Sequence, residues 1–141
     1  MAERYDQESG QFVCDFISRL PTTDTGKLFN LYDWQRSALM EFYGTLVSET
    51  DTEDLPAPIN AEWLRKYWYL YLEIPKKNGK SELAAALGLY HLFADGELNA
   101  EVYICAADKE NASIVYNAAV FMATSAPWTA KMVRISCREP L

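Results

Sequence analysis

The sequence predicts an α/β fold with a parallel central sheet, and three apolar runs carry that prediction. Residues 67–72 form a continuous aromatic and aliphatic run, as expected of a strand that is buried on both faces. Two further apolar runs follow at 102–107 and 132–136, and helical segments separate the three runs. Strands that alternate with helices of this length form parallel βαβ units with right-handed crossovers. We therefore expect a three-layer α/β domain.

Two helices are expected before the first strand. Apolar residues recur at helical spacing over 12–20, and Pro21 ends that segment. Asp33 is a plausible N-cap for a second helix that runs to about Leu46. An acidic loop with two prolines follows at 48–60, and a short helical turn is expected at 61–66.

The chain is expected to form one structural domain, in which an N-terminal helical segment, 1–60, precedes a βαβ core, 61–141. Its 141 residues are enough for a hydrophobic core, and half of them are hydrophobic. The formal net charge is −7; residues 1–60 hold four basic and eleven acidic side chains, while 61–141 hold nine of each. This balance leaves no electrostatic footprint for nucleic acid over the first part of the chain.

Metal binding and histidine chemistry have few residues to draw on. The cysteines Cys14, Cys105 and Cys137 form no C-x-x-C pair, and Cys105 lies in an apolar run where it is expected to be a small buried hydrophobe. His91 is the only histidine, which argues against zinc sites and histidine-based catalysis. The N-terminus lacks the apolar core of a signal peptide, and no stretch resembles a membrane span, so we expect a cytoplasmic protein with no membrane partner.

The strongest functional signal lies between the first predicted strand and the next helix, in the six residues from Lys76 to Ser81. Pro75 ends the strand, because proline cannot donate to a sheet ladder. Gly79 would let the backbone approach phosphates closely, and the amides at the start of the helix would point at the phosphate oxygens. Lys80 would reach the outer phosphates, and the Ser81 hydroxyl would ligate Mg²⁺. The sequence therefore predicts a phosphate-binding loop in a P-loop NTPase-like fold.

Two features of the loop count against this interpretation. The full motif places a glycine five positions before Gly79, where this sequence has Ile74. The tripeptide Gly-Lys-Ser is also common by chance, and most isolated matches are surface turns. The predicted strand before the loop and the predicted helix after it are what favour phosphate binding.

The whole segment 73–81 resembles the variant Walker A segment of tailed-phage terminase large subunits of the HK97 type, the ATPases that pump DNA into capsids. Their loop commonly reads Pro-Arg-Lys-Asn-Gly-Lys-Ser, and this chain has Pro-Lys-Lys-Asn-Gly-Lys-Ser. The flanking segments agree in order: Leu-Tyr-Asp-Trp-Gln at 31–35, Leu-Ala-Ala-Ala-Leu at 83–87, Ala-Asp-Gly-Glu at 94–97 and Ala-Glu-Val-Tyr-Ile-Cys-Ala-Ala-Asp at 100–108. The resemblance covers roughly residues 11–135.

This resemblance implies a protein that binds ATP with Mg²⁺ and, in the full family, works with a portal protein, a small terminase subunit and double-stranded DNA. It places Gln35 against the adenine ring, because an amide can both donate to and accept from the polar edge of the base. The alternative is a solvated glutamine on the first turn of a helix. Many relatives carry arginine where Lys76 stands. Lys76, Lys77 and Asn78 would line the phosphates, although both lysines can equally be solvated loop cations.

ATP hydrolysis also needs a carboxylate that holds Mg²⁺ and another that orients the attacking water. Glu73 would lie on the loop's own strand, where a structural role is expected. Asp108 looks like a Walker B acid, but it also precedes a helix, where aspartate is more commonly an N-cap. The resemblance places the true acid pair beyond residue 141, so we expect the N-terminal ATP-binding portion of a terminase large subunit, inactive by itself. The alternatives are a non-hydrolysing remnant that binds nucleotide or partners, and a small-molecule kinase, for which no arginine-rich lid is visible.

Overall fold

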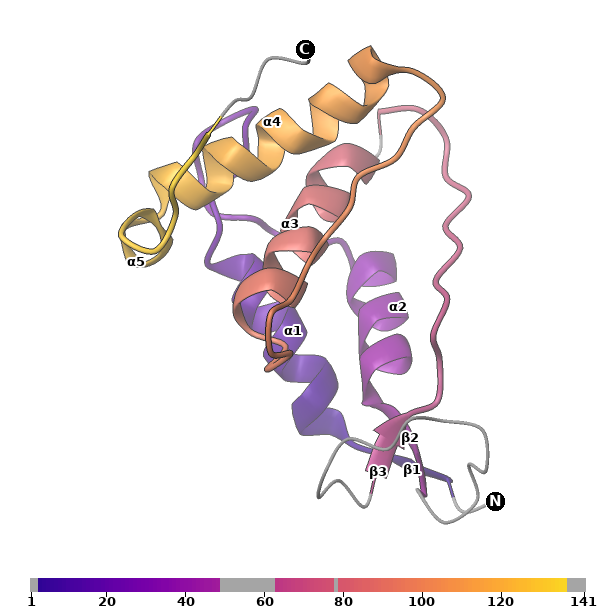
Figure 1. The fold of residues 1–141 in the computed structure, drawn as a ribbon. Coiled ribbons are helices and arrows are strands. Elements are labelled where there is room, and N and C mark those ends of the chain that lie inside the picture. The colour runs from indigo at the N-terminus through magenta and orange to yellow at the C-terminus, as the bar shows by residue number, and fades with distance from the viewer. Residues whose placement is uncertain (1–2, 49–62, 78, 137–141) are drawn as a thin grey trace. The chain divides into compact units, whose positions relative to one another are not determined.

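The computed structural model describes residues 3–48, 63–77 and 79–136, which are mainly helical (Figure 1). The helices are α1 (Gln7–Ser18), α2 (Asp33–Gly44), α3 (Lys80–Phe93), α4 (Lys109–Ser125) and α5 (Pro127–Ala130), and the strands are β1 (Glu3–Tyr5), β2 (Thr45–Ser48) and β3 (Trp63–Arg65). These elements belong to two compact units. The first comes from Met1–Asp15 and Leu31–Glu73, and the second from Phe16–Asn30 and Ile74–Leu141.

The described strands form one small antiparallel sheet, so the predicted parallel central sheet is wrong. The strand order is β1-β2-β3, and both neighbouring pairs are antiparallel. Glu3 pairs with Val47 and Leu46 pairs with Arg65. All three strands lie in the first unit, whereas the sequence predicted no strand before residue 67.

The apolar run at 67–72 is extended but belongs to no strand among the described residues. Exposure alternates along it: Tyr69 is 93% exposed and Tyr71 is 84% exposed, while Leu70 between them is 37% exposed. No residue of the segment is buried, so neither face is covered as it would be in a central strand. The prediction of a strand buried on both faces failed because apolar content does not specify a partner, and a strand requires a hydrogen-bonded neighbour.

The other two predicted strands fail in the same way. Residues 102–107 and 132–136 belong to no strand in the described chain, and Tyr103 is 78% exposed. Cys105 is exposed, not a buried hydrophobe as its neighbours suggested. By contrast, Cys14 is buried in α1, and burial raises the pKa of its thiol.

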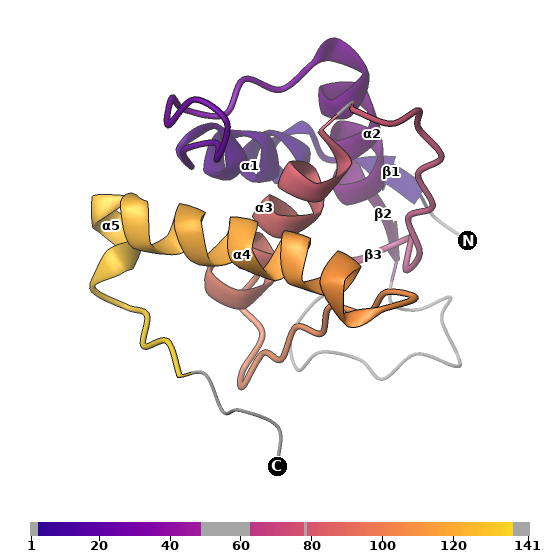
Figure 2. The ribbon, with the colours of Figure 1, turned by 90° about the horizontal axis from the view of Figure 1, so that it is seen from above.

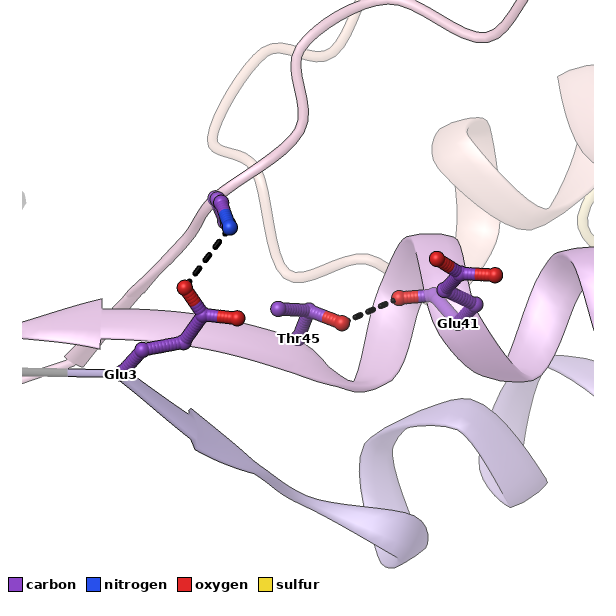
Figure 3. Close-up of polar contacts among 4 residues, drawn as sticks. Glu3, Glu41 and Thr45 are labelled. Atoms are coloured by element: carbon purple, nitrogen blue, oxygen red, sulfur yellow. Dashed lines mark hydrogen bonds and ion pairs between the residues drawn. The ribbon is translucent and has the colours of Figure 1, made fainter.

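In the first unit, the N-cap of α2 is Tyr32, so the predicted N-cap Asp33 is instead the first residue of the helix, which ends at Gly44, earlier than the predicted Leu46. The β-branched Thr45 and Val47 then enter β2, where branched side chains fit a pleated surface. The Thr45 hydroxyl donates to the Glu41 carbonyl oxygen at 2.8 Å, which links the strand to the last turn of the helix (Figure 3).

A charged pair ties β1 to the residue after β3. The Lys66 ammonium donates to the Glu3 carboxylate at 2.7 Å (Figure 3), and this hydrogen bond raises the pKa of Lys66. The predicted helical turn at 61–66 is therefore wrong over 63–65, which form β3, and its first two residues lie outside the described chain.

The core of the second unit is built where α4 lies across α3 (Figure 2). Small side chains on α3, Ala85 and Ala86, are fully buried and allow close approach. Phe16 packs edge-on against Tyr90 and Trp128, with ring centroids 5.6 and 5.2 Å away. Over the described residues, no helix is both long enough and apolar enough to span a membrane.

Candidate phosphate-binding site

The candidate site is built on the start of α3. The helix begins at Lys80, and Gly79 before it has φ 74° and ψ 21°, a left-handed conformation that side chains with a Cβ disfavour. The Gly79 carbonyl accepts the Leu83 amide at 2.9 Å, which closes the first turn. Glycine carries no side chain that could cap the turn, and no side-chain hydrogen bond caps it from that position. The first amides of α3 are therefore left to other acceptors, such as water or an anion.

Lys80 is the first residue of α3, so it is the lysine nearest in sequence to these amides. Its ammonium donates to the carbonyl oxygen of Ile74 at 2.7 Å, so its side chain reaches back across the loop. Ile74 is the residue that replaces the glycine of the full motif. The Lys80 side chain is exposed, so an anion could compete with the carbonyl for the ammonium.

The rest of the loop is a tight turn that carries two more lysines. Lys76 and Lys77 form the turn, both are exposed, and Lys77 has a positive φ of 66°, which is unusual for a residue other than glycine. Ser81 is half-buried in the first turn of α3. Asn78, the fourth predicted phosphate contact, lies outside the described residues. The structure thus brings Lys76, Lys77, Lys80 and Ser81 into one loop and helix start.

The structure shows a contact of Glu82 that the sequence did not indicate. Both oxygens of the Glu82 carboxylate accept the Thr23 amide, at 3.3 and 3.4 Å. Burial raises the pKa of Glu82, the hydrogen bond from Thr23 lowers it, and the charge of Asp24 raises it further. No spacing in the sequence points to this contact, because 59 residues separate its partners.

Gln35 has a different environment from either one that the sequence suggested. It is 1% exposed, and its side-chain oxygen accepts the Tyr32 amide at 2.9 Å, so it helps to close the start of α2. The sequence did not indicate this role, because it favoured Asp33 as the N-cap, whereas the N-cap is Tyr32 and Gln35 is the third residue of the helix. Gln35 belongs to the first unit and the loop to the second. Its adenine contact stays a prediction.

Asp108 is the N-cap of α4, which confirms the commoner of its two predicted roles. One carboxylate oxygen accepts the Asn111 amide at 2.7 Å, and the other accepts the Asn111 side-chain amide at 2.7 Å. Glu73 is exposed in the extended segment before the loop. Within the described chain, no three histidine, cysteine or acidic side chains gather as they would around a metal ion.

The comparisons with known proteins add no relative to this description. Neither the protein-family models, nor the curated proteins, nor the solved structures gave a match to this chain. A function for the site is therefore argued from its residues and geometry.

Proposed function

We propose that this chain binds ATP with Mg²⁺ through Gly79, Lys80 and Ser81, as the N-terminal ATP-binding portion of a phage terminase large subunit. The observation that carries the proposal is the start of α3. A left-handed glycine opens a 14-residue helix without a side-chain cap, and the next residue is a lysine whose ammonium lies back over the loop. An uncapped helix start beside a lysine is suited to phosphate, because amides and ammonium are all donors.

Each residue has one task in this proposal. The amides that follow Gly79 donate to the phosphate oxygens, and Lys80 exchanges the Ile74 carbonyl for an outer phosphate. Lys76 and Lys77 add positive charge, and Asn78 contributes to the same loop. When bound, Mg²⁺ would neutralise part of the phosphate charge, and the Ser81 hydroxyl is the group in the first turn that can ligate it. The proposal does not depend on Gln35.

A second candidate, nucleotide binding without hydrolysis, is favoured by the position of Asp108. Both of its carboxylate oxygens are engaged with Asn111, so they are committed to the start of α4. Hydrolysis depends on groups that stabilise the transition state more than the bound nucleotide, and acids that fix the metal and the water supply that difference. We therefore expect the chain to bind ATP and to turn it over only at a background rate.

The proposed partners follow from the family that the loop resembles. They are a portal protein, a small terminase subunit and double-stranded DNA, in the cytoplasm of a bacterial host. The acidic first part of the chain argues that any DNA contact belongs elsewhere in the assembly.

Titration calorimetry with Mg–ATP tests the binding proposal. Lys80→Ala should weaken binding by about a hundredfold or more, because it removes the ammonium from a charged contact. The matched control is Lys109→Ala, which changes the first residue of α4 and should leave the affinity unchanged. Equal binding by the wild type and Lys80→Ala would refute the proposal.

An ATPase assay tests whether this chain by itself hydrolyses the ATP that it binds. We expect no turnover above background in the purified chain. Steady turnover that both Lys80→Ala and Asp108→Ala remove would make Asp108 a metal-binding acid, and the non-hydrolysing candidate would then be wrong.

A further inference from the structure

The second unit contains a well-defined turn that the proposed function does not use. In this segment, the 22–27 turn, the Thr22 amide donates to the Lys27 carbonyl at 2.8 Å and the Gly26 amide donates to the Thr22 carbonyl at 2.9 Å. The Thr22 and Thr25 hydroxyls lie 3.0 Å apart, and Thr25 also accepts the Lys27 amide at 3.2 Å. An isolated bridge between Pro21 and Leu28 closes the base of the turn. The turn therefore holds its own shape.

A hydrogen bond, not a buried apolar contact, joins this turn to α3. Residues 23–28 are exposed, so they bury little against the helix. The Thr23 amide nevertheless points at the Glu82 carboxylate and lies 3.3 and 3.4 Å from its two oxygens. These distances are long for hydrogen bonds, but an ionised acceptor strengthens the contact.

The contact between Thr23 and Glu82 has a geometric consequence: it fixes the third residue of α3, directly after Lys80 and Ser81. Binding sites gain affinity when their donors are held in place before the ligand arrives.

We propose that Glu82 is a positioning residue for the phosphate-binding loop, and that it acts by fastening the 22–27 turn to the first turn of α3. This inference rests on the proposed function, because it assigns Glu82 a role in preparing the same amides for phosphate. Loss of the contact lets the first turn of α3 fray, and the amides then lose part of their alignment.

The test combines hydrogen exchange at the Thr23 amide with calorimetric Mg–ATP affinity. Glu82→Ala and Glu82→Asp should both speed exchange at Thr23 and weaken Mg–ATP about threefold to tenfold, the range for one lost hydrogen bond. Glu82→Asp keeps the charge but is one methylene too short, so it covers the case in which Glu82→Ala does not fold. Glu82→Gln keeps an acceptor at full length and should restore most of both properties. Glu110→Ala, in the first turn of α4, should change neither.

Two results would overturn the inference while the proposed function stands. One is faster exchange at Thr23 in Glu82→Asp with wild-type affinity, which would make the contact purely structural. The other is unchanged exchange at Thr23 in Glu82→Asp, which would mean that Glu82 does not hold the turn. If the wild type binds no Mg–ATP at all, the proposed function fails and this inference fails with it.

Discussion

Three helices of this chain begin in two different ways. At the start of α2, the buried Gln35 accepts the Tyr32 amide at 2.9 Å, and at the start of α4, Asp108 accepts the Asn111 amide at 2.7 Å. At the start of α3, a left-handed glycine stands where a capping side chain would be. A side chain of the chain accepts a backbone amide at each of the first two helix starts, although at α2 this is the amide of the N-cap residue Tyr32 itself; no side-chain cap is present at the third.

The comparison of the helix starts indicates that α3 lacks the stabilisation that a capping side chain would give. A capping side chain is worth about 1 kcal/mol to a helix, so an uncapped start needs another reason. An anion supplies one, because free amides and the positive end of the helix dipole both favour it. Three lysines lie at or just before the uncapped start of α3, in a chain whose net charge is −7. We therefore interpret α2 and α4 as structural helix starts and α3 as a ligand-binding one.

The largest effect on stability is expected at the start of α2, where Gln35 accepts the Tyr32 amide. Gln35→Ala removes a fully buried amide and leaves the Tyr32 amide without its acceptor, so the free energy of unfolding should fall by about 1–3 kcal/mol. Urea denaturation of the wild type and the variant measures it. A loss smaller than about 0.5 kcal/mol would mean that Gln35 does not close α2.

The same variant tests whether Gln35 also recognises adenine. If it does, Gln35→Ala should weaken ATP more than GTP, because an amide that pairs with one base leaves unpaired groups beside another. Equal weakening of both nucleotides, or of neither, would leave Gln35 with the structural role alone.

The start of α3 should be sensitive to a substitution that disfavours the left-handed conformation of Gly79. Gly79→Ala places a Cβ in the left-handed region and should cost about 1–2 kcal/mol of stability and weaken Mg–ATP binding. Gly96→Ala is the matched control: its φ is 79° and no atom lies within 4 Å of the added Cβ, so it should cost similar stability and leave binding unchanged. Equal nucleotide affinities in the two variants would show that Gly79 has no special role.

At the start of α4, a substitution should lower the stability of the protein and leave its nucleotide affinity unchanged. Asp108→Ala removes the acceptor of the Asn111 amide and should cost about 1 kcal/mol of stability. Its Mg–ATP affinity should match that of the wild type, as measured by calorimetry. Loss of nucleotide binding without loss of stability would identify Asp108 as part of the site.

The smallest effect is a dependence on pH. The pKa of Glu82 is raised above its ordinary value of 4.5, so the folded state binds this proton more tightly than the unfolded state does. The associated stability is present below pH 4.5 and is lost as pH rises through the raised pKa. Glu82→Gln should remove this loss, so its stability relative to the wild type should rise across that window. Parallel stability curves in pH-dependent denaturation would contradict it.

The helices were predictable from local patterns. The helix start after the loop and the cap at Asp108 both follow from short-range chemistry that neighbouring residues determine. The strands were not predictable, because strand pairing depends on segments that lie far apart in the sequence. The run at 67–72 has the composition of a buried strand, yet Tyr69 and Tyr71 face solvent. The three-residue β1 and β3 carried no pattern that was strong enough to predict them.

The candidate site was predictable to the same extent. Gly79, Lys80 and Ser81 were identified from spacing; the structure gives Gly79 a left-handed conformation at the start of α3, and the phosphate contacts of the three residues stay a prediction. The contact between Glu82 and Thr23 could not be predicted, because it joins segments far apart in the sequence. The hydrogen bond from the Tyr32 amide to Gln35 was not predictable either, because tyrosine is not a residue that marks a helix start.

Amide chemical shifts on titration with Mg–ATP test the central claim most directly, because they report each helix start separately. The account predicts that the amides of Gly79, Lys80, Ser81 and Glu82 shift as nucleotide is added, while the capped amide of Asn111 does not. Shifts of equal size at the two helix starts, or no shift at residues 79–82, would contradict it.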